Sequence, residues 1–364
     1  MHDLAIYAPG SAPLYAGEYR AVGGAERQMF LLARALAARG LRVCHVVHAA
    51  ELPEVRDGVR LIELEPPADR ARIPGGLIRR VRRALAAADA RVYLQRSAGV
   101  ATALVGAFAR AHRRPFIYST SSDLDLLYRI PQAWSETVGF RLGLRLAGTV
   151  VVQTRAQAAA AASDPRIVHI PSLCEPVHRR SPTPPRDLFL WVGRAASYKN
   201  PLAFVELARA VPEAHFVMVG VDQLAVMQLA GRSRSFESKL PPNLELLGPL
   251  SPAQLGALYA RAVAVVNTSQ FEGFPNALLE GWAHGALALS LRIDPDGVIA
   301  RHGLGVVANG SHAVLAAAAA TMWRARAAQE AERAAALRYV IASHAPEVVA
   351  ARWAALLGDV LGRA

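Results

Sequence analysis

The sequence predicts an α/β protein with two doubly wound domains, and three observations carry this prediction. The chain has 364 residues, whereas a typical single domain has roughly 100 to 200. Short apolar runs alternate with amphipathic helical patterns from end to end, which is typical of parallel α/β proteins. Prolines gather within residues 171–187, and the alternation restarts after them. With 53% hydrophobic and 19% charged residues, the composition allows a core of ordinary size and excludes wholesale disorder.

The first half of the chain carries the first series of elements. A strand over 4–7 precedes a helix over 25–39, for which Gly40 supplies a left-handed C-terminal cap. The other expected strands cover 41–48, 59–65, 91–95, 115–119, 149–153 and 166–170. The other expected helices lie near 77–88, 98–112, 131–147 and 155–162.

The second half repeats the pattern, with alanine-rich helix at its end. Strands are expected over 188–192, 215–220, 244–247, 262–268 and 286–291, and helices over 201–210, 252–261 and 277–284. We therefore expect two Rossmann-like domains over 1–175 and 188–345, a proline-rich linker over 176–187, and a final helix over 346–364 that packs back on the first domain. The carboxyl ends of both sheets would face a cleft between the domains.

Several protein classes are disfavoured. No stretch of about 18 apolar residues lacks a charge, so no spanning helix is expected. Met1-His2-Asp3 offers neither a basic region nor a cleavage site of a secretory signal. The only two cysteines, Cys44 and Cys174, are too few for a disulfide framework or a cysteine-rich metal cluster. We expect a cytoplasmic protein.

The net charge of +12 is concentrated in the first half. Residues 1–180 contain 25 arginines and 15 acidic residues, whereas residues 181–364 contain 16 basic and 14 acidic ones. This asymmetry predicts an anionic partner: a nucleic acid, a phosphorylated substrate or the negative surface of a bilayer. Codon bias is the alternative explanation of the total charge, because Lys199 and Lys239 are the only lysines.

One basic helix, over 77–85, could contact a membrane. Leu77, Ile78, Val81 and Leu85 fall on one face, and four arginines surround them, as in helices that lie in a bilayer interface. The alternative is a helix that docks this face on the sheet and leaves a solvated basic edge.

The most informative segment covers residues 267–280. Glu272 lies in an irregular loop after a strand, and Pro275-Asn276 suits the start of a helix that carries Glu280. The amides at this helix start would form an anion site. Two carboxylates beside an anion site indicate a ligand with a phosphate end and a hydroxyl-rich end.

Two further segments suit the same ligand. Gly193-Arg194 ends a strand and Lys199 follows shortly after, so the two cations could clamp a diphosphate. A lysine in an arginine-rich chain suggests a need for a compact point charge. Gly23-Gly24 opens the first long helix, where glycine allows close approach of phosphate to the backbone; an ordinary turn is the alternative.

Together these segments resemble the retaining family 4 glycosyltransferases, which have the GT-B fold, in content and in order along the chain. The family's two glutamates separated by seven residues match Glu272 and Glu280. The resemblance implies that Glu280 holds the ribose of a nucleotide-sugar, that Glu272 holds the donor sugar, and that Arg194 and Lys199 neutralise the diphosphate. The donor-binding residues that it implies are Gly23, Gly24, Gly193, Gly248, Gly273, Phe274, Pro275, Asn276 and Glu280.

The resemblance also implies an acceptor side in the first domain. Many members carry a histidine there, but residues 119–123 contain none. Asp123 is therefore expected in the catalytic role, with Arg96 and Ser122 nearby. Segments 95–97, 151–154 and 294–297 are similar to members that build cell-surface polysaccharides or glycolipids, so the acceptor would be a saccharide or a lipid-linked glycan at the inner face of a membrane.

The expected reaction moves a hexose from a UDP- or GDP-sugar to a hydroxyl group. Cationic side chains and helix dipoles can stabilise the leaving diphosphate without a metal, so no divalent metal or other cofactor is expected. Three alternatives remain: a nucleotide-sugar 2-epimerase, a catalytically silent sugar-nucleotide-binding subunit and a basic nucleic-acid-binding protein. Only 7% of residues are aromatic and no recognised nucleic-acid motif occurs, which argues against the last.

Overall fold

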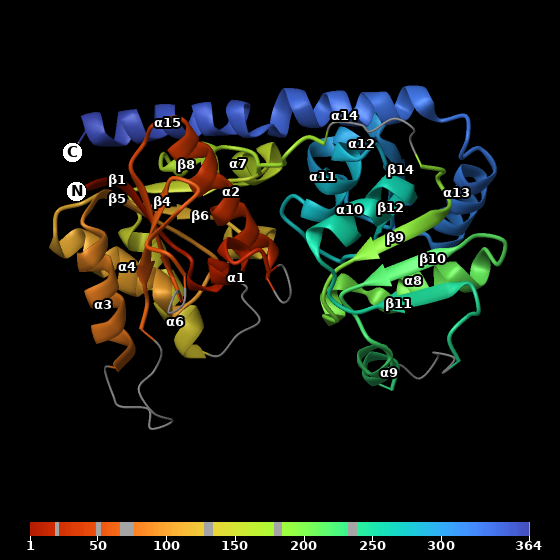
Figure 1. Ribbon diagram of the computed structural model, residues 1–364, viewed down its shortest axis with the longest axis horizontal. Coiled ribbons are helices and arrows are strands. Elements are labelled where there is room, and N and C mark those ends of the chain that lie inside the picture. Colours follow the sequence, from red (N-terminus) through yellow and green to blue (C-terminus); the bar gives the residue numbers. More distant parts are fainter. Residues whose placement is uncertain are drawn as a thin grey trace. The chain divides into compact units, whose positions relative to one another are not determined.

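The computed structural model describes residues 1–18, 22–48, 52–65, 76–126, 134–177, 184–231 and 239–363 (Figure 1). The chain divides into two compact units. The first contains Met1–Leu173 together with Pro346–Ala364, and the second contains Cys174–Ala345. Residues 178–183 of the expected linker lie outside the described residues, as do residues 131–133 of an expected helix.

The first unit is built on an eight-stranded sheet with the order β3-β4-β2-β1-β5-β6-β7-β8. All of its strand pairs are parallel except β3 with β4. Its strands are β1 (His2–Tyr7), β2 (Val43–Val47), β3 (Val55–Arg56), β4 (Val59–Glu63), β5 (Ala90–Arg96), β6 (Phe116–Ser119), β7 (Thr149–Val152) and β8 (Ile167–His169). Its helices are α1 (Ala12–Tyr15), α2 (Gly24–Ala38), α3 (Gly76–Ala88), α4 (Val100–Ala111), α5 (Asp123–Leu126), α6 (Trp134–Leu146), α7 (Arg155–Ala160) and α15 (Pro346–Gly362).

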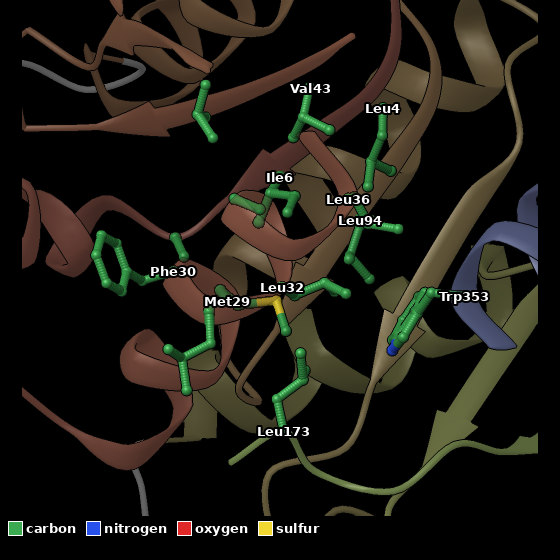
Figure 2. Close-up of a cluster of buried hydrophobic side chains, with 14 of the residues drawn as sticks. Leu4, Ile6, Met29, Phe30, Leu32, Leu36, Val43, Leu94, Leu173 and Trp353 are labelled. Atoms are coloured by element: carbon green, nitrogen blue, oxygen red, sulfur yellow. The ribbon is translucent and has the colours of Figure 1, made fainter. Parts of the chain in front are cut away.

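Both faces of this sheet are buried because helices cover each of them. Successive side chains of a strand point to opposite faces and so enter two different cores. Along β1, Leu4 and Ile6 belong to the core beneath α2 and α15, whereas Ala5 and Tyr7 belong to the core beneath α3, α4 and α6. In the first core, Trp353 of α15 lies close to the side chains of α2 and β5 (Figure 2). The C-terminal helix therefore packs on the first unit, as the sequence predicted.

The second unit holds a six-stranded, fully parallel sheet with the order β11-β10-β9-β12-β13-β14. Its strands are β9 (Leu188–Val192), β10 (Phe216–Val219), β11 (Leu244–Leu247), β12 (Ala262–Asn267), β13 (Leu287–Ser290) and β14 (Gly305–Val307). Its helices are α8 (Pro201–Ala210), α9 (Gln223–Ala230), α10 (Pro252–Arg261), α11 (Asn276–Ala283), α12 (Val298–His302), α13 (His312–Arg324) and α14 (Glu330–His344), with short 3-10 turns at Ser197–Lys199 and Pro295–Gly297.

The predicted fold class is confirmed, and the differences concern short elements. Strand β14 and helices α9 and α12 were not expected; each is short and lacks a long apolar period. The alanine-rich C-terminal stretch forms helices α13, α14 and α15, and the last of them starts at Pro346, a residue suited to a first turn. Gly40 takes the left-handed conformation (φ 85°) expected of a helix cap. None of the described helices is long and apolar enough to cross a bilayer.

Candidate functional site

The loop between β12 and α11 forms the centre of the candidate site in the second unit. It starts at the carboxyl edge of the parallel sheet, where α/β proteins bind their ligands. Its first residues, Thr268 and Ser269, are almost fully buried. Its Phe274 side chain packs edge-on against Trp282 and near His344, with ring centroids 6.3 and 4.8 Å away. The loop is thus anchored in the core, and Phe274 can offer a ligand only its backbone.

Lys199 and Glu272 meet at this loop. The Lys199 Nζ donates to Glu272 Oε1, and the Ser269 hydroxyl donates to the same oxygen at 2.7 Å. Both partners are partly accessible: 23% of the Lys199 side chain and 13% of the Glu272 side chain are exposed. The structure therefore joins two of the predicted donor-site residues directly, across 73 positions of sequence.

The backbone explains how Lys199 reaches that position. The Thr268 hydroxyl donates to the Lys199 carbonyl at 2.7 Å and accepts from Trp191 Nε1 at 2.9 Å. The Gln270 amide donates to the Tyr198 carbonyl at 2.8 Å. The 3-10 turn that carries Lys199 is thereby tied to the loop of Glu272 on both sides, and Tyr198 also stacks on Phe271 with ring centroids 4.9 Å apart.

Helix α11 continues from this loop. Its N-cap residue, Pro275, makes no side-chain capping bond, so the amides of the first turn suit an anion. Glu280 lies one turn into the helix and is half-buried, and its carbonyl accepts from the His284 ring at 2.8 Å. Gly273 is buried, and Asn276 is the first helical residue.

Arg194 follows β9 at the same sheet edge. A Cβ atom on Gly193 would lie 2.8 Å from the Trp191 ring, and one on Gly220 (φ 85°) would lie 2.5 Å from the Gly193 carbonyl oxygen. Only glycine fits these two strand ends. The Arg194 side chain is exposed, and no ion pair or hydrogen bond joins it to the described part of the chain. Gly248, after the edge strand β11, is exposed and has open space around its Cα.

A pocket of about 300 Å³ lies in the first unit, at the carboxyl ends of β1 and β5. The starts of α2 and α4 and one residue of α6, Glu136, complete its wall. Gly23 is the N-cap of α2 and makes no side-chain capping bond, and Gly24 is the exposed first residue. A Cβ atom on Gly23 would collide with the carboxylate of Glu26, which lines the pocket together with Arg96.

Arg96 ends β5 and is 9% exposed. Burial lowers the pKa of its guanidinium to about 10, while the charges of Asp125, Tyr118 and Glu26 act to raise it. Since this pKa is well above neutrality, Arg96 is a buried cation. Its Nε atom is buried without a hydrogen-bond partner in the described chain.

The predicted acceptor-side residues Asp123 and Ser122 lie on and just before the short helix α5, and both have protein partners. Asp123 accepts from Gln157 Nε2 at 2.7 Å, and its side chain is exposed. The Ser122 hydroxyl donates to Asp125 at 3.2 Å. Asp125 is the buried carboxylate of this group and also accepts from Tyr118 at 2.8 Å. Burial raises the pKa of Tyr118, and the charge of Asp125 and this hydrogen bond raise it further.

Sequence reasoning missed three acidic residues. Asp125 follows Ser122 by three positions, a spacing at which a hydroxyl meets a carboxylate in a helical turn. Glu26 follows the predicted glycine pair by two residues, so its position at the helix start was a usable signal. Glu136 accepts from the Val100 amide at 2.7 Å, and nothing in the sequence indicates that contact. Within the described ranges, no cluster of three or more His, Cys, Asp or Glu side chains could hold a metal ion.

Comparisons with known proteins concern the family and the fold. Residues 23–172 match the family model described as "Glycosyl transferase 4-like domain", and residues 186–325 match "Glycosyl transferases group 1". None of the curated proteins matches the sequence.

Solved structures share the whole fold. Sucrose-phosphate synthase from Thermosynechococcus elongatus is 16% identical with a TM-score of 0.77, and the match covers 100% of each chain. HepE from Anabaena, solved with UDP and glucose, is 16% identical with a TM-score of 0.74 over 99% of this chain and 100% of that one. WaaG, a glycosyltransferase of lipopolysaccharide biosynthesis, is 16% identical with a TM-score of 0.66 over 95% and 98%.

Proposed function

The chain belongs to the family 4, group 1 glycosyltransferases with the GT-B fold, and on that premise we propose that it moves a hexose from a UDP- or GDP-sugar to a hydroxyl of a saccharide or lipid-linked acceptor. Transfer from a nucleotide-sugar is the activity of the family. The observation that carries the proposal is the contact of Lys199 with Glu272, because it brings a cation and a carboxylate together beside the start of α11. Cations and the free amides of a helix start bind phosphate. Carboxylates accept hydrogen bonds from hydroxyl groups.

Each donor-site residue has a proposed role. Lys199 and Arg194 neutralise the diphosphate as it leaves, and the first amides of α11 add their dipoles. Glu272 accepts hydrogen bonds from the sugar hydroxyls, together with the backbone of Gly273. Glu280, one turn further, accepts from the ribose.

The proposed reaction retains the anomeric configuration. The bond between the anomeric carbon and the diphosphate oxygen breaks, and the acceptor oxygen bonds to the same face of that carbon. The acceptor proton moves to the departing diphosphate, so the step needs no protein nucleophile. Asp123, held by Gln157, is the proposed polar partner of the acceptor, and the charge on the diphosphate is met by side chains rather than by a metal.

Two of the related structures guide the choice of ligands. HepE was solved with UDP and glucose, which supports UDP-glucose as the first donor to test. WaaG acts in lipopolysaccharide biosynthesis, which supports a cell-envelope acceptor.

We also propose that the first unit docks on an anionic membrane surface. Helix α3 buries Val81 and Leu85, so its apolar face is used mainly for packing, but Leu77 and Ile78 at its start are 41% and 57% exposed. Helix α6 exposes Trp134, Val138 and Leu142 at a spacing of four residues. The arginines of α3 and α6 would add attraction to anionic lipids. These two exposed apolar groups, on helices that both contact α4, are together called the α3–α6 surface below.

A thermal-shift panel tests the donor proposal. UDP, GDP, ADP and their sugar conjugates are compared with and without EDTA, since a ligand at about 100 times its Kd adds roughly 2.7 kcal/mol to the free energy of unfolding. One nucleotide is expected to raise the melting temperature whether or not EDTA is present. If no nucleotide shifts it, or if EDTA removes the shift, the metal-independent donor site is wrong.

A further inference from the structure

The pocket of the first unit has the size of a subsite for one small ligand. Its volume of about 300 Å³ is at the lower end of the range for small-molecule sites. Its lining combines apolar side chains, such as Tyr7 and Met29, with the polar side chains of Glu26, Gln95 and Arg96. It lies at the carboxyl edge of a parallel sheet, the edge at which such folds bind ligands.

Arg96 is the unusual residue of this pocket. A buried guanidinium is normally held by carboxylates or carbonyls, because leaving it unpaired costs several kcal/mol. Here its Nε atom is buried without a partner, and no hydrogen bond or ion pair within the described residues reaches its terminal nitrogens. A native buried polar group that lacks a partner requires an explanation.

Two of the three neighbouring carboxylates, Asp125 and Glu136, accept hydrogen bonds from other donors. The Oδ2 atom of Asp125 accepts three hydrogen bonds of 2.6 to 3.1 Å, one from the Tyr118 hydroxyl and two from the amide and hydroxyl of Ser121. Glu136 accepts from the first amide of α4 at 2.7 Å. Glu26 lies beside Gly23, and within the described residues it forms neither a hydrogen bond nor an ion pair with Arg96. The three carboxylates compensate part of the Arg96 charge at a distance, but they accept no hydrogen bond from its guanidinium.

The end of β5 is held so that Arg96 keeps its place. The Gln95 amide nitrogen donates to the carbonyls of Arg96 and Ser97, at 2.8 and 2.5 Å. Ser97 has φ 79°, a conformation that non-glycine residues rarely adopt and that accompanies functional sites. Gln95 Oε1 is also buried without a partner. An open cationic donor and an open neutral acceptor thus lie on adjacent residues.

We propose that this pocket binds an anionic substituent of the acceptor sugar, a phosphate or a carboxylate, through the guanidinium of Arg96. The inference rests on the proposed transferase function and specifies its acceptor. A guanidinium holds either anion through two parallel hydrogen bonds, while Gln95 and the pocket carboxylates suit the sugar hydroxyls. A neutral sugar would leave the buried cation without a partner.

Direct binding measurements test the proposal without any donor. Titration calorimetry of the full chain would compare glucose 6-phosphate, glucuronic acid and glucose. At least one anionic sugar is expected to bind about tenfold or more tightly than glucose, as for hydrogen bonds to charged groups. Comparison of the two anionic sugars shows whether the pocket prefers a phosphate or a carboxylate. Titration with inorganic phosphate alone shows whether the sugar ring contributes to binding.

Two variants make the test specific. Arg96→Met should remove the preference for anionic sugars, and Arg96→Lys should restore part of it. Arg110→Met removes an exposed arginine from α4 and should keep the full preference. Equal binding of glucose and both anionic sugars by the unaltered protein, or an unchanged preference in Arg96→Met, would overturn the proposal.

The donor site provides an independent readout. UDP binding to the second unit should be the same in Arg96→Met as in the unaltered chain, which also shows that the variant folds. Loss of the anionic preference with UDP binding intact supports the acceptor assignment. Failure of UDP binding in the unaltered chain would instead contradict the proposed function and leave the sugar titrations interpretable.

Discussion

The Lys199 ammonium group is paired with the Glu272 carboxylate, although the two residues are proposed to bind different ends of one donor. Glu272 has a second donor in Ser269, at 2.7 Å. In the proposed donor complex, Lys199 turns to the diphosphate while Ser269 continues to hold Glu272. The pair therefore compensates both charges until the donor is bound, and it explains how two partly buried charges are tolerated together.

Replacement of Lys199 should affect transfer more than folding. In Lys199→Met the developing charge on the diphosphate loses a cation, and kcat/KM should fall about 100-fold or more, the size seen when a preorganised donor is removed. Initial-rate assays with UDP-sugars measure this loss. Lys239→Met, which changes the other lysine, at an exposed position, is the matched control and should retain normal rates. Full turnover by Lys199→Met would contradict the diphosphate assignment.

Replacement of Glu280 should weaken the nucleotide rather than the chemistry. Glu280→Ala removes the carboxylate proposed to hold the ribose, and a hydrogen bond to a charged group contributes about 1.5–3 kcal/mol. The Kd of UDP or GDP, measured by calorimetry, should therefore rise about tenfold or more. Glu213→Ala, at an exposed position of the same unit, should leave the Kd unchanged. An identical Kd in both variants would remove Glu280 from the nucleotide site.

The sequence was sufficient for the architecture and for locating the strand ends and helix starts that carry the proposed donor segments, because these depend on local patterns. Strand alternation, the left-handed cap at Gly40 and the loop of Glu272 each require only a few neighbouring residues. The contact of Lys199 with Glu272 depends on Thr268 and Trp191, which come together only when β9 and β12 pair. That pairing is tertiary, so the sequence predicted two donor segments but not their ion pair.

The acceptor side was less predictable for the same reason. Asp123 and Asp125 are equivalent candidates in the sequence, and only the turn of α5 decides which one is buried. Asp125 is 3% exposed and hydrogen-bonded to Tyr118, whereas Asp123 remains at the surface. Within the described residues, the Arg96 guanidinium lacks a hydrogen-bond partner because two of its neighbouring carboxylates already bind other groups. No local sequence pattern encodes those tertiary contacts.

Two glycine substitutions should have opposite effects on stability, one at the strand ends beside the proposed donor site and one in an exposed turn of α15. Gly220→Ala places a Cβ atom at φ 85° and 2.5 Å from the Gly193 carbonyl oxygen, so the free energy of unfolding should fall by about 1–3 kcal/mol. Gly358→Ala lies in α15, where nothing surrounds the new methyl group, and should gain up to about 1 kcal/mol from helix propensity. Urea unfolding measures both. Equal urea midpoints for the two variants would show that the backbone is not tightly packed at Gly193 and Gly220.

Burial of His45 should make the first unit sensitive to acid. Burial lowers the pKa of His45 to about 3, below its usual 6.5, and its Nδ1 atom lies 2.8 Å from the Tyr15 hydroxyl. The unfolded chain therefore binds a proton that the folded chain does not, and stability is lost as the pH falls from about 6.5 towards 3. The free energy of unfolding should therefore fall by at most about 1.4 kcal/mol for each pH unit in this range. Denaturation at several pH values should show a shallower acid slope in His45→Gln; an unchanged slope would contradict the assignment.

The α3–α6 surface should bind anionic vesicles. Trp134 is 80% exposed and Ile78 is 57% exposed, and burial of each large apolar side chain contributes about 1.5–3 kcal/mol. The double variant Ile78→Ser with Trp134→Ser should lose tenfold or more of its binding to vesicles that contain phosphatidylglycerol, measured by co-sedimentation. Leu224→Ser, which removes a 66% exposed side chain from the second unit, should bind normally. Because arginines supply part of the attraction, added salt should weaken binding of the unaltered chain. Vesicle binding that persists in the double variant, or that is equal on neutral lipid, would place the membrane contact elsewhere.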